Sequence, residues 1–182
     1  MKRIVFIIVI LAAIFASAGC GGTGDIGGDN GGSTGDPLIY IVDLCYINNE
    51  YVETGDEELP MVFYYRNQHM YAPEGRQYLA LLDETLREIV IGSESVGTMI
   101  TDKVQFNSVE VKDGTAYVDI AGENLSGSSL EEGLLISQIV YSLTGSFEEI
   151  ESVQFLIDGE VTETLMGHYD TEKPYETGIY PI

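Results

Sequence analysis

The stretch VEVKDGTAYVDI, residues 109–120, decides the fold class of this chain. Asp113 and Gly114 stand between two runs rich in β-branched and aromatic residues. A tight turn between such runs needs the positive φ that glycine accepts at no steric cost. The sequence therefore predicts a hairpin whose strands are residues 104–111 and 115–120.

Amphipathic helices are predicted on both sides of this hairpin. Residues 76–91 carry apolar side chains at the spacing i, i+3, i+7 and i+10, which is one face of a helix: Leu79, Leu82, Leu86 and Ile89. After the hairpin, Ser129 and Glu132 have the spacing of a capping box. The buried face of this second helix is predicted to be Leu135, Ile136, Ile139, Val140 and Leu143.

Further extended runs complete the pattern, at residues 38–47, 61–65, 153–157 and 161–165, with an acidic loop at 53–58. The order along the chain is strands, helix, hairpin, helix, strands. One sheet of about four strands offers the surface that two amphipathic helices need to cover. We predict an α+β fold, a small mixed β-sheet with two helices on one face.

The first nineteen residues have the anatomy of a secretory signal peptide. Lys2 and Arg3 precede an apolar run of 15 residues at 4–18, which is shorter than the roughly 17–25 residues of a membrane-spanning helix. Cys20 follows small residues and resembles the cysteine of the bacterial lipobox, whose thiol receives a diacylglyceryl group, although Ser17 stands where Leu is usual. We predict lipid attachment at Cys20 and a position on the outer face of the cell membrane. The alternatives are an ordinary secreted protein and an uncleaved anchor.

Residues 20–36, CGGTGDIGGDNGGSTGD, are predicted to form a glycine-rich tether. A flexible chain of this length has a root-mean-square reach of about 20–24 Å. The G-x-G-x-x-G pattern at 22–27 is not a dinucleotide site, because it does not join a strand to a helix. The predicted organisation is a signal peptide at 1–19, the tether at 20–36, one domain at 37–170 and a polar tail at 171–182.

The chain is strongly acidic, with 30 acidic and 8 basic residues and a formal net charge of −22. Loss of Lys2 and Arg3 with the signal peptide would change the charge to −24. The sequence predicts no nucleic-acid partner, because phosphate binding needs a clustered basic face. Anionic lipid head groups would repel such a surface, so we expect the domain to stand off from the membrane.

The sequence offers little equipment for catalysis or metal binding. Cys45 would be the single thiol left after lipidation, and its apolar neighbours predict a buried, unreactive side chain. His69 and His168 are nearly a hundred residues apart and belong to no metal-ligand pattern. We predict no catalytic residue, no metal and no cofactor.

Two groups of residues nevertheless leave functional alternatives open. Asp119 and Glu123 lie where the hairpin ends and could supply the acid and base of an envelope hydrolase, although close carboxylate pairs arise by chance in so acidic a chain. Tyr64 and Tyr65, with Tyr71 nearby, could stack on the sugar rings of a wall polymer. The same tyrosines also fit ordinary strand packing.

Three segments of the sequence together resemble the GerMN domain family. They are the hairpin at 109–120, IVYSLTGSFEEIESVQFLIDG at 139–159 and ETLMGH at 163–168. The resemblance covers most of residues 38–170, but Thr101-Asp102-Lys103-Val104 stands where the family often has P-x-G-T. The family is named for a sporulation and germination lipoprotein, so the resemblance implies an α+β interaction unit, similar to ring-building motifs of secretion systems, without catalytic residues.

The sequence thus predicts a non-enzymatic, lipid-anchored module of a Gram-positive-type bacterium. It would mediate protein assembly during sporulation, germination or envelope maintenance, through protein partners or self-association. The second hypothesis is a lipoprotein that binds a wall polymer or cations through its tyrosines or its acidic residues.

Overall fold

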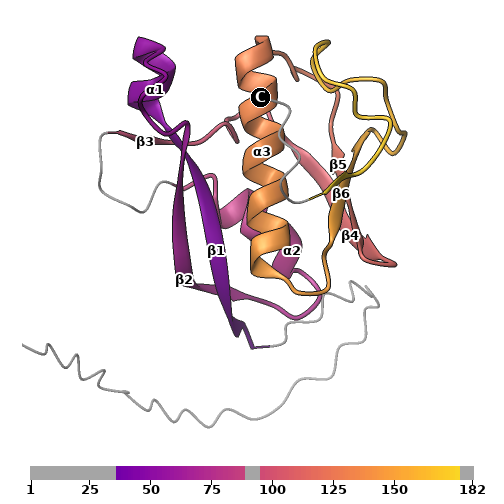
Figure 1. Cartoon of the computed structure of the whole chain (residues 1–182). Coiled ribbons are helices and arrows are strands. Elements are labelled where there is room, and N and C mark those ends of the chain that lie inside the picture. Colours follow the sequence, from indigo (N-terminus) through magenta and orange to yellow (C-terminus); the bar gives the residue numbers. More distant parts are fainter. Residues whose placement is uncertain (1–35, 89–94, 177–182) are drawn as a thin grey trace, which may run out of the picture. The chain divides into compact units, whose positions relative to one another are not determined.

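The computed structural model describes residues 36–88 and 95–176, so the predicted signal peptide, Cys20 and nearly all of the tether lie outside the described residues. Its strands form two sheets (Figure 1). The first has the order β2-β1-β3, with β1 at Leu38–Asn48, β2 at Val62–Ala72 and β3 at Val96–Gly97. The second has the order β4-β5-β6-β7, with β4 at Phe106–Lys112, β5 at Thr115–Ile120, β6 at Ser152–Ile157 and β7 at Tyr175–Glu176.

The predicted α+β class is confirmed, but the strands divide into two sheets instead of the single sheet expected. Helix α3, Ser129–Ser146, lies between β1 of one sheet and β6 of the other (Figure 1). Its sequence explains the arrangement, because it carries buried residues beyond the predicted face, among them Leu134, Ser137 and Gln138. A helix buried on more than one side needs more than one surface to cover it.

One edge of β1 pairs with β2, and the middle of its other edge is covered by α3. The hydroxyl of Ser142 accepts a hydrogen bond from the amide of Cys45 at 3.0 Å. Ser146 accepts from the amide of Asp43 and donates to the Asp43 carbonyl, both at 3.0 Å. Two serine side chains therefore take the place of a neighbouring strand, and a helix closes a sheet edge that could otherwise pair with another chain.

The hairpin predicted from residues 109–120 is confirmed. β4 and β5 pair antiparallel up to the pair Lys112–Thr115, and the two turn residues Asp113 and Gly114 have φ values of +51° and +81°. β5 then pairs with β6 in parallel, so the connection between them crosses over through α3. A parallel pair requires a crossover of this kind, usually a helix.

The predicted helix at residues 76–91 is shorter and partly of a different type. α2 covers Gln77–Ala80 and continues as the π-helical turn η1, Leu81–Thr85, in which the amide of Leu86 donates to the carbonyl of Leu81 at 3.0 Å. The wider turn shifts the buried face, so that Ala80 and Leu81 are buried along with Leu82 and Leu86. Residues 89–91 lie outside the described residues.

Three other segments differ from the sequence-based expectation. Residues 53 and 54 of the acidic loop predicted at 53–58 belong instead to a short helix, α1 at Asn49–Thr54. The side chain of Asn48 caps the start of this helix, and Gly55, with a φ of +67°, ends it. Residues 161–165 form an irregular segment with bends at 163 and 165 instead of a strand. The folded domain extends beyond residue 170, because β7 lies in the expected tail and Tyr175 is buried against Phe155.

The hydrophobic core lies where the two sheets, α3 and α2–η1 meet. Its buried members come from each of these elements and include Tyr46, Leu82, Val118, Leu135 and Phe155. None of the helices in the described ranges is both long enough and apolar enough to span a lipid bilayer.

Candidate interaction site

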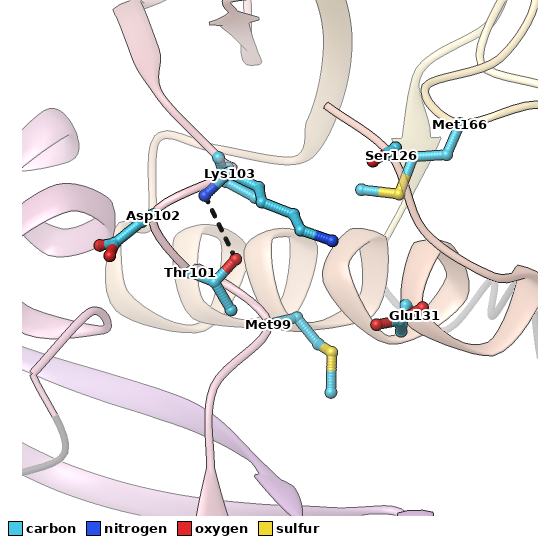
Figure 2. Close-up of a pocket in the computed structure, with 8 residues that line it drawn as sticks. Met99, Thr101, Asp102, Lys103, Ser126, Glu131 and Met166 are labelled. Atoms are coloured by element: carbon cyan, nitrogen blue, oxygen red, sulfur yellow. Dashed lines mark hydrogen bonds between the residues drawn. The ribbon is translucent and has the colours of Figure 1, made fainter. Parts of the chain in front are cut away.

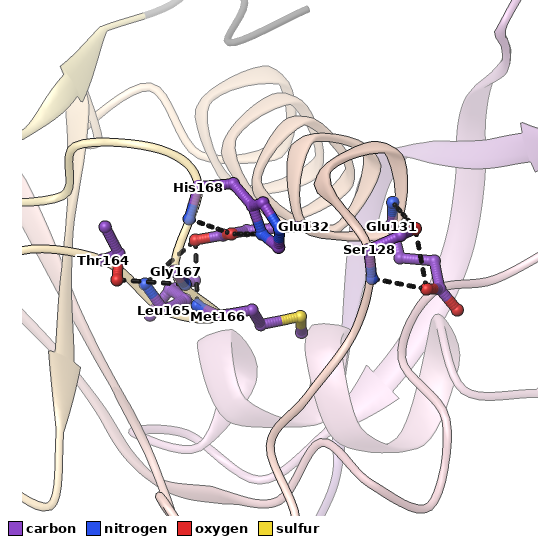
Figure 3. A network of polar contacts seen from close by, with 8 residues as sticks. All are labelled: Ser128, Glu131, Glu132, Thr164, Leu165, Met166, Gly167 and His168. Atoms are coloured by element: carbon purple, nitrogen blue, oxygen red, sulfur yellow. Dashed lines mark hydrogen bonds and ion pairs between the residues drawn. The ribbon is translucent and has the colours of Figure 1, made fainter.

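The first turn of α3 contains a fully buried carboxylate, that of Glu132 (Figure 3). Its Oε1 accepts hydrogen bonds from the amides of Leu165 at 3.0 Å and Met166 at 2.9 Å. Its Oε2 accepts from the amide of His168 at 2.9 Å and lies 2.8 Å from Nδ1 of the same residue. Because both oxygens accept hydrogen bonds from residues 165–168, this carboxylate holds that segment to the start of α3.

Residues 164–168, which we call the carboxylate loop, curl around Glu132 (Figure 3). The hydroxyl of Thr164 accepts from the amide of Gly167 at 3.0 Å. Gly167 has a φ of +101°, which a residue with a Cβ rarely adopts. The ETLMGH segment thus has a structural role, since it fastens the connection between β6 and β7 to the start of α3.

The capping box at the start of α3 is one residue earlier than predicted. Ser128 is the N-cap, its hydroxyl accepts from the amide of Glu131 at 3.3 Å, and the Glu131 carboxylate accepts from the Ser128 amide at 2.7 Å. The Ser128 hydroxyl also donates to the Glu131 carboxylate at 2.8 Å. The hydrogen bonds that the carboxylate accepts from the Ser128 amide and hydroxyl, with the charge of Lys103, lower the pKa of Glu131. The prediction of a box between Ser129 and Glu132 was wrong, because Glu132 points into the protein.

Substitution of Ser128 and of Ser129 distinguishes the observed N-cap from the predicted one by experiment. We expect Ser128→Ala to lower the free energy of unfolding by about 1 kcal/mol, because an amide of the first turn loses its acceptor. Ser129→Ala, at the predicted cap, should have a smaller effect. Urea unfolding of both variants measures this, and a larger loss for Ser129→Ala would contradict the observed cap.

A cavity of about 340 Å³ lies beside the capping box, between the segment 99–104, the start of α3 and the carboxylate loop (Figure 2). Met99 and Met166 supply thioethers, and the Lys103 side chain extends between them, whereas the Asp102 carboxylate points away. All four residues of the segment 101–104 are among those that line this cavity. Methionine adapts its shape to what it contacts, so the lining suits an apolar group of a partner molecule.

A second cavity, of about 500 Å³, also borders the first turn of α3, at Leu130. Tyr51 of α1, Pro60 and Leu130 of α3 are among the residues that line it. Both cavities are thus built around one helix end, which is also where the carboxylate loop is fastened. This end of the domain is the best-formed candidate for contact with another molecule.

The structure places Tyr64 and Tyr65 on opposite faces of β2. The ring of Tyr65 packs against Tyr46 at a centroid distance of 5.8 Å and joins the core, whereas Tyr64 is 45% exposed and contacts Tyr141 at 5.5 Å. The two rings therefore do not form one stacking platform. Of these two residues, only Tyr64 presents a ring surface that a ligand could reach, and the nearby Tyr71 is also exposed.

The carboxylates of Asp119 and Glu123 lie in different environments. Asp119 is nearly buried, and its Oδ1 accepts from the amide of Gly159 at 2.9 Å, which fixes the turn after β6. Glu123 is exposed in the turn after β5. Neither residue lines the two cavities at the start of α3, so the geometry gives the hydrolase hypothesis no support.

The two histidines belong to different parts of the domain. His69 is exposed on β2, whereas the ring of His168 contacts the Glu132 carboxylate. Within the described residues there is no group of three or more His, Cys, Asp or Glu side chains that could hold a metal ion.

Cys45 is buried, and burial raises its pKa to about 12. At pH 8 the thiol is therefore neutral, so we expect the folded Cys20→Ala variant to resist a thiol-specific reagent. Unfolding in urea should expose the side chain and allow one label per chain. Rapid labelling without urea would contradict the buried position.

These features define a class: an α+β domain of two sheets, in which the crossover helix of the second sheet also covers β1 of the first and its first turn fastens the loop at residues 164–168. The chain belongs to the Germane family, described as "Sporulation and spore germination", whose model matches residues 46–163. The resemblance to GerMN domains is thereby confirmed. Comparison with curated protein sequences gives no match.

Solved structures of similar fold include a "Putative Lipoprotein" from Clostridium perfringens, with a TM-score of 0.51 and 18% identity over 78% of this chain and 91% of that one. The tandem GerMN domains of the sporulation protein GerM from Bacillus subtilis give a TM-score of 0.55 and 17% identity over 76% of this chain and 46% of that one. The first GerMN domain of the same protein alone gives a TM-score of 0.51 and 17% identity over 78% of this chain and 97% of that one. At these identities the similarity shows the fold.

Proposed function

We propose that this protein is a non-enzymatic, lipid-anchored module on the outer face of the membrane of a Gram-positive-type bacterium. It would mediate protein assembly during sporulation, germination or envelope maintenance. The observation that carries the proposal is the Germane match over residues 46–163. The signal-like residues 1–19 and Cys20, followed by the glycine-rich tether, support the anchor.

The anchor is tested by fractionating cells that make the full chain or its Cys20→Ala variant. The unaltered protein should stay with the membrane, and mass spectrometry should find a diacylglyceryl group on its first mature residue. The variant should lose the group and leave the membrane fraction. An unmodified thiol at position 20 of the unaltered protein would overturn the anchor.

The assembly role is tested at the cavity beside α3, where the adaptable thioethers of Met99 and Met166 favour contact with a partner protein. A photo-reactive amino acid in place of Lys103, which is exposed at this cavity, should give cross-linked species in intact membranes. The matched control is the same substitution at Lys112, another exposed lysine at the hairpin turn. Recovery of monomer alone from both variants would count against an assembly role.

A wall-polymer-binding lipoprotein is the second candidate, favoured by the exposed ring of Tyr64. Aromatic rings can stack on the apolar faces of sugars, and Tyr64 alone of the predicted pair offers such a face. Retention on purified cell wall should then fall for Tyr64→Ala. It should be unchanged for a folded Tyr65→Phe variant, and equal retention of all three proteins would remove this candidate.

A further inference from the structure

Exposed apolar side chains gather at the start of β1, which follows the tether in the sequence, and at the end of β2, which pairs with it. Six large hydrophobic residues among the described ones are exposed, and four of them lie here: Leu38, Ile39, Ile41 and Tyr71. We call these four residues the apolar patch. Ile39 and Tyr71 are register partners across the two strands, and Ile41 is paired with His69. Because side chains alternate along a strand, Ile39, Ile41 and Tyr71 share the outer face of the sheet.

This part of the chain also avoids negative charge. Residues 37–42 and 59–73 contain no Asp or Glu, although the whole chain has 30. The first acidic residue beyond the patch on β1 is Asp43, whose carboxylate forms an ion pair with Arg66 at 3.0 Å. His69 and Arg66 are both exposed on β2. The ribbon of β1 and β2 is therefore apolar to weakly basic in a protein that is otherwise strongly acidic.

The position of the patch in the sequence brings it close to the proposed anchor. The apolar patch begins at residue 38, directly after the tether predicted at 20–36. A tether of this length has a reach of about 20–24 Å, so a bilayer that holds Cys20 is always within reach of the strand that follows. The tether gives the domain a high effective concentration at the lipid surface, so even a weak contact between the apolar patch and the lipid would be populated.

From these observations we propose that the apolar patch rests on the lipid surface, with Ile39, Ile41 and Tyr71 at the level of the head groups. Tyrosine favours that interface because its ring is apolar and its hydroxyl is wet. Anionic head groups repel the acidic remainder of the domain, so the surface formed by residues 37–42 and 59–73, which contain no Asp or Glu, is the one that can approach them. The domain would then be oriented by its patch instead of standing off from the membrane as the net charge alone suggests.

This inference depends on the lipid anchor of the proposed function, and one experiment separates the two. The full-length lipoprotein is reconstituted in vesicles of phosphatidylglycerol and phosphatidylethanolamine that contain a nitroxide-labelled lipid. A fluorophore is attached through His69→Cys, which pairs with Ile41 without belonging to the apolar patch. Cys45 is buried and would not react, and Cys20 would be blocked by its lipid.

The matched control is Val161→Cys, because Val161 is 51% exposed and apolar like Ile39 and Ile41 at 60% and 61%. Val161 belongs to the connection between β6 and β7. In Figure 1 this connection, coloured from orange to yellow, lies away from the start of β1. We expect several-fold stronger quenching at position 69 than at position 161. Ile39→Ser with Ile41→Ser should reduce the quenching at 69 to the control level, with an unchanged urea midpoint because both side chains are exposed.

Each other outcome has a definite meaning. Equal quenching at 69 and 161 with a lipidated Cys20 overturns the lipid contact and leaves the anchor in place. An unmodified Cys20 overturns the anchor of the proposed function and the lipid contact with it. If quenching at 69 decreases as more unlabelled lipoprotein is added to the vesicles, the patch binds a second copy of the chain instead of lipid, which also overturns the inference.

Discussion

Replacing Glu132 by Ala is expected to lower the free energy of unfolding by about 3–5 kcal/mol, one of the two largest effects that we predict. The carboxylate is fully buried and accepts from the amides of Leu165, Met166 and His168. Its removal leaves these donors without their acceptor, and each unsatisfied buried group costs about 1–3 kcal/mol. The shift of the urea unfolding midpoint measures the loss, and hydrogen exchange of the carboxylate loop should accelerate in the variant.

The neighbouring residue provides the control for this prediction. Glu131→Gln changes an exposed carboxylate at the same helix start, and glutamine can still accept the hydrogen bond from the Ser128 amide. Its unfolding midpoint should stay close to that of the unaltered protein. Equal midpoints for Glu132→Ala and Glu131→Gln would show that the carboxylate loop does not depend on Glu132.

The second large effect is expected for the double variant Ser142→Ala with Ser146→Ala. The two hydroxyls bind the backbone of β1 at Cys45 and Asp43, and Cys45 is 1% exposed, so water cannot replace the lost acceptor there. We expect a loss of about 2–4 kcal/mol in the free energy of unfolding, from two or three unsatisfied backbone groups. Hydrogen exchange at the Cys45 amide should also become faster, because this amide loses its acceptor, the Ser142 hydroxyl.

Thr144→Ala is the matched control, because Thr144 lies between the two serines and its hydroxyl donates to the Val140 carbonyl within α3. A helix tolerates this loss, since the hydroxyl competes with the backbone of its own helix and reaches no strand. The double serine variant should therefore be clearly less stable than Thr144→Ala. Similar midpoints would contradict the role of α3 as the cover of β1.

Much of this fold follows from local sequence patterns. The hairpin at Asp113-Gly114 and the strand at 153–157 were predicted from turn chemistry and β-rich runs, because both signals act over a few residues. α1 was missed, since none of its residues is buried and it has no apolar period to detect. The π-helical turn at 81–85 was missed as well, because the spacing of its leucines fits an ordinary helix.

The two sheets and the candidate site depend on contacts between distant residues. Ser128-Ser129 and Glu131-Glu132 are adjacent pairs, so spacing alone cannot choose between two capping boxes. Helical period could have decided it, since Glu132 falls in line with Leu135, Ile136 and Ile139 on the buried face. Nothing in the sequence indicates that the amides of residues 165–168 would meet that carboxylate.

The cover of β1 by α3 has a consequence for how the chain is made. Asp43 and its partner Ser146 are 103 residues apart, and synthesis runs from the amino terminus. The first strand therefore emerges long before the helix that satisfies its amides, and during that interval its apolar residues and the Cys45 thiol are unprotected. A nascent chain of this protein is expected to need shielding from aggregation and oxidation until its last quarter has been polymerised.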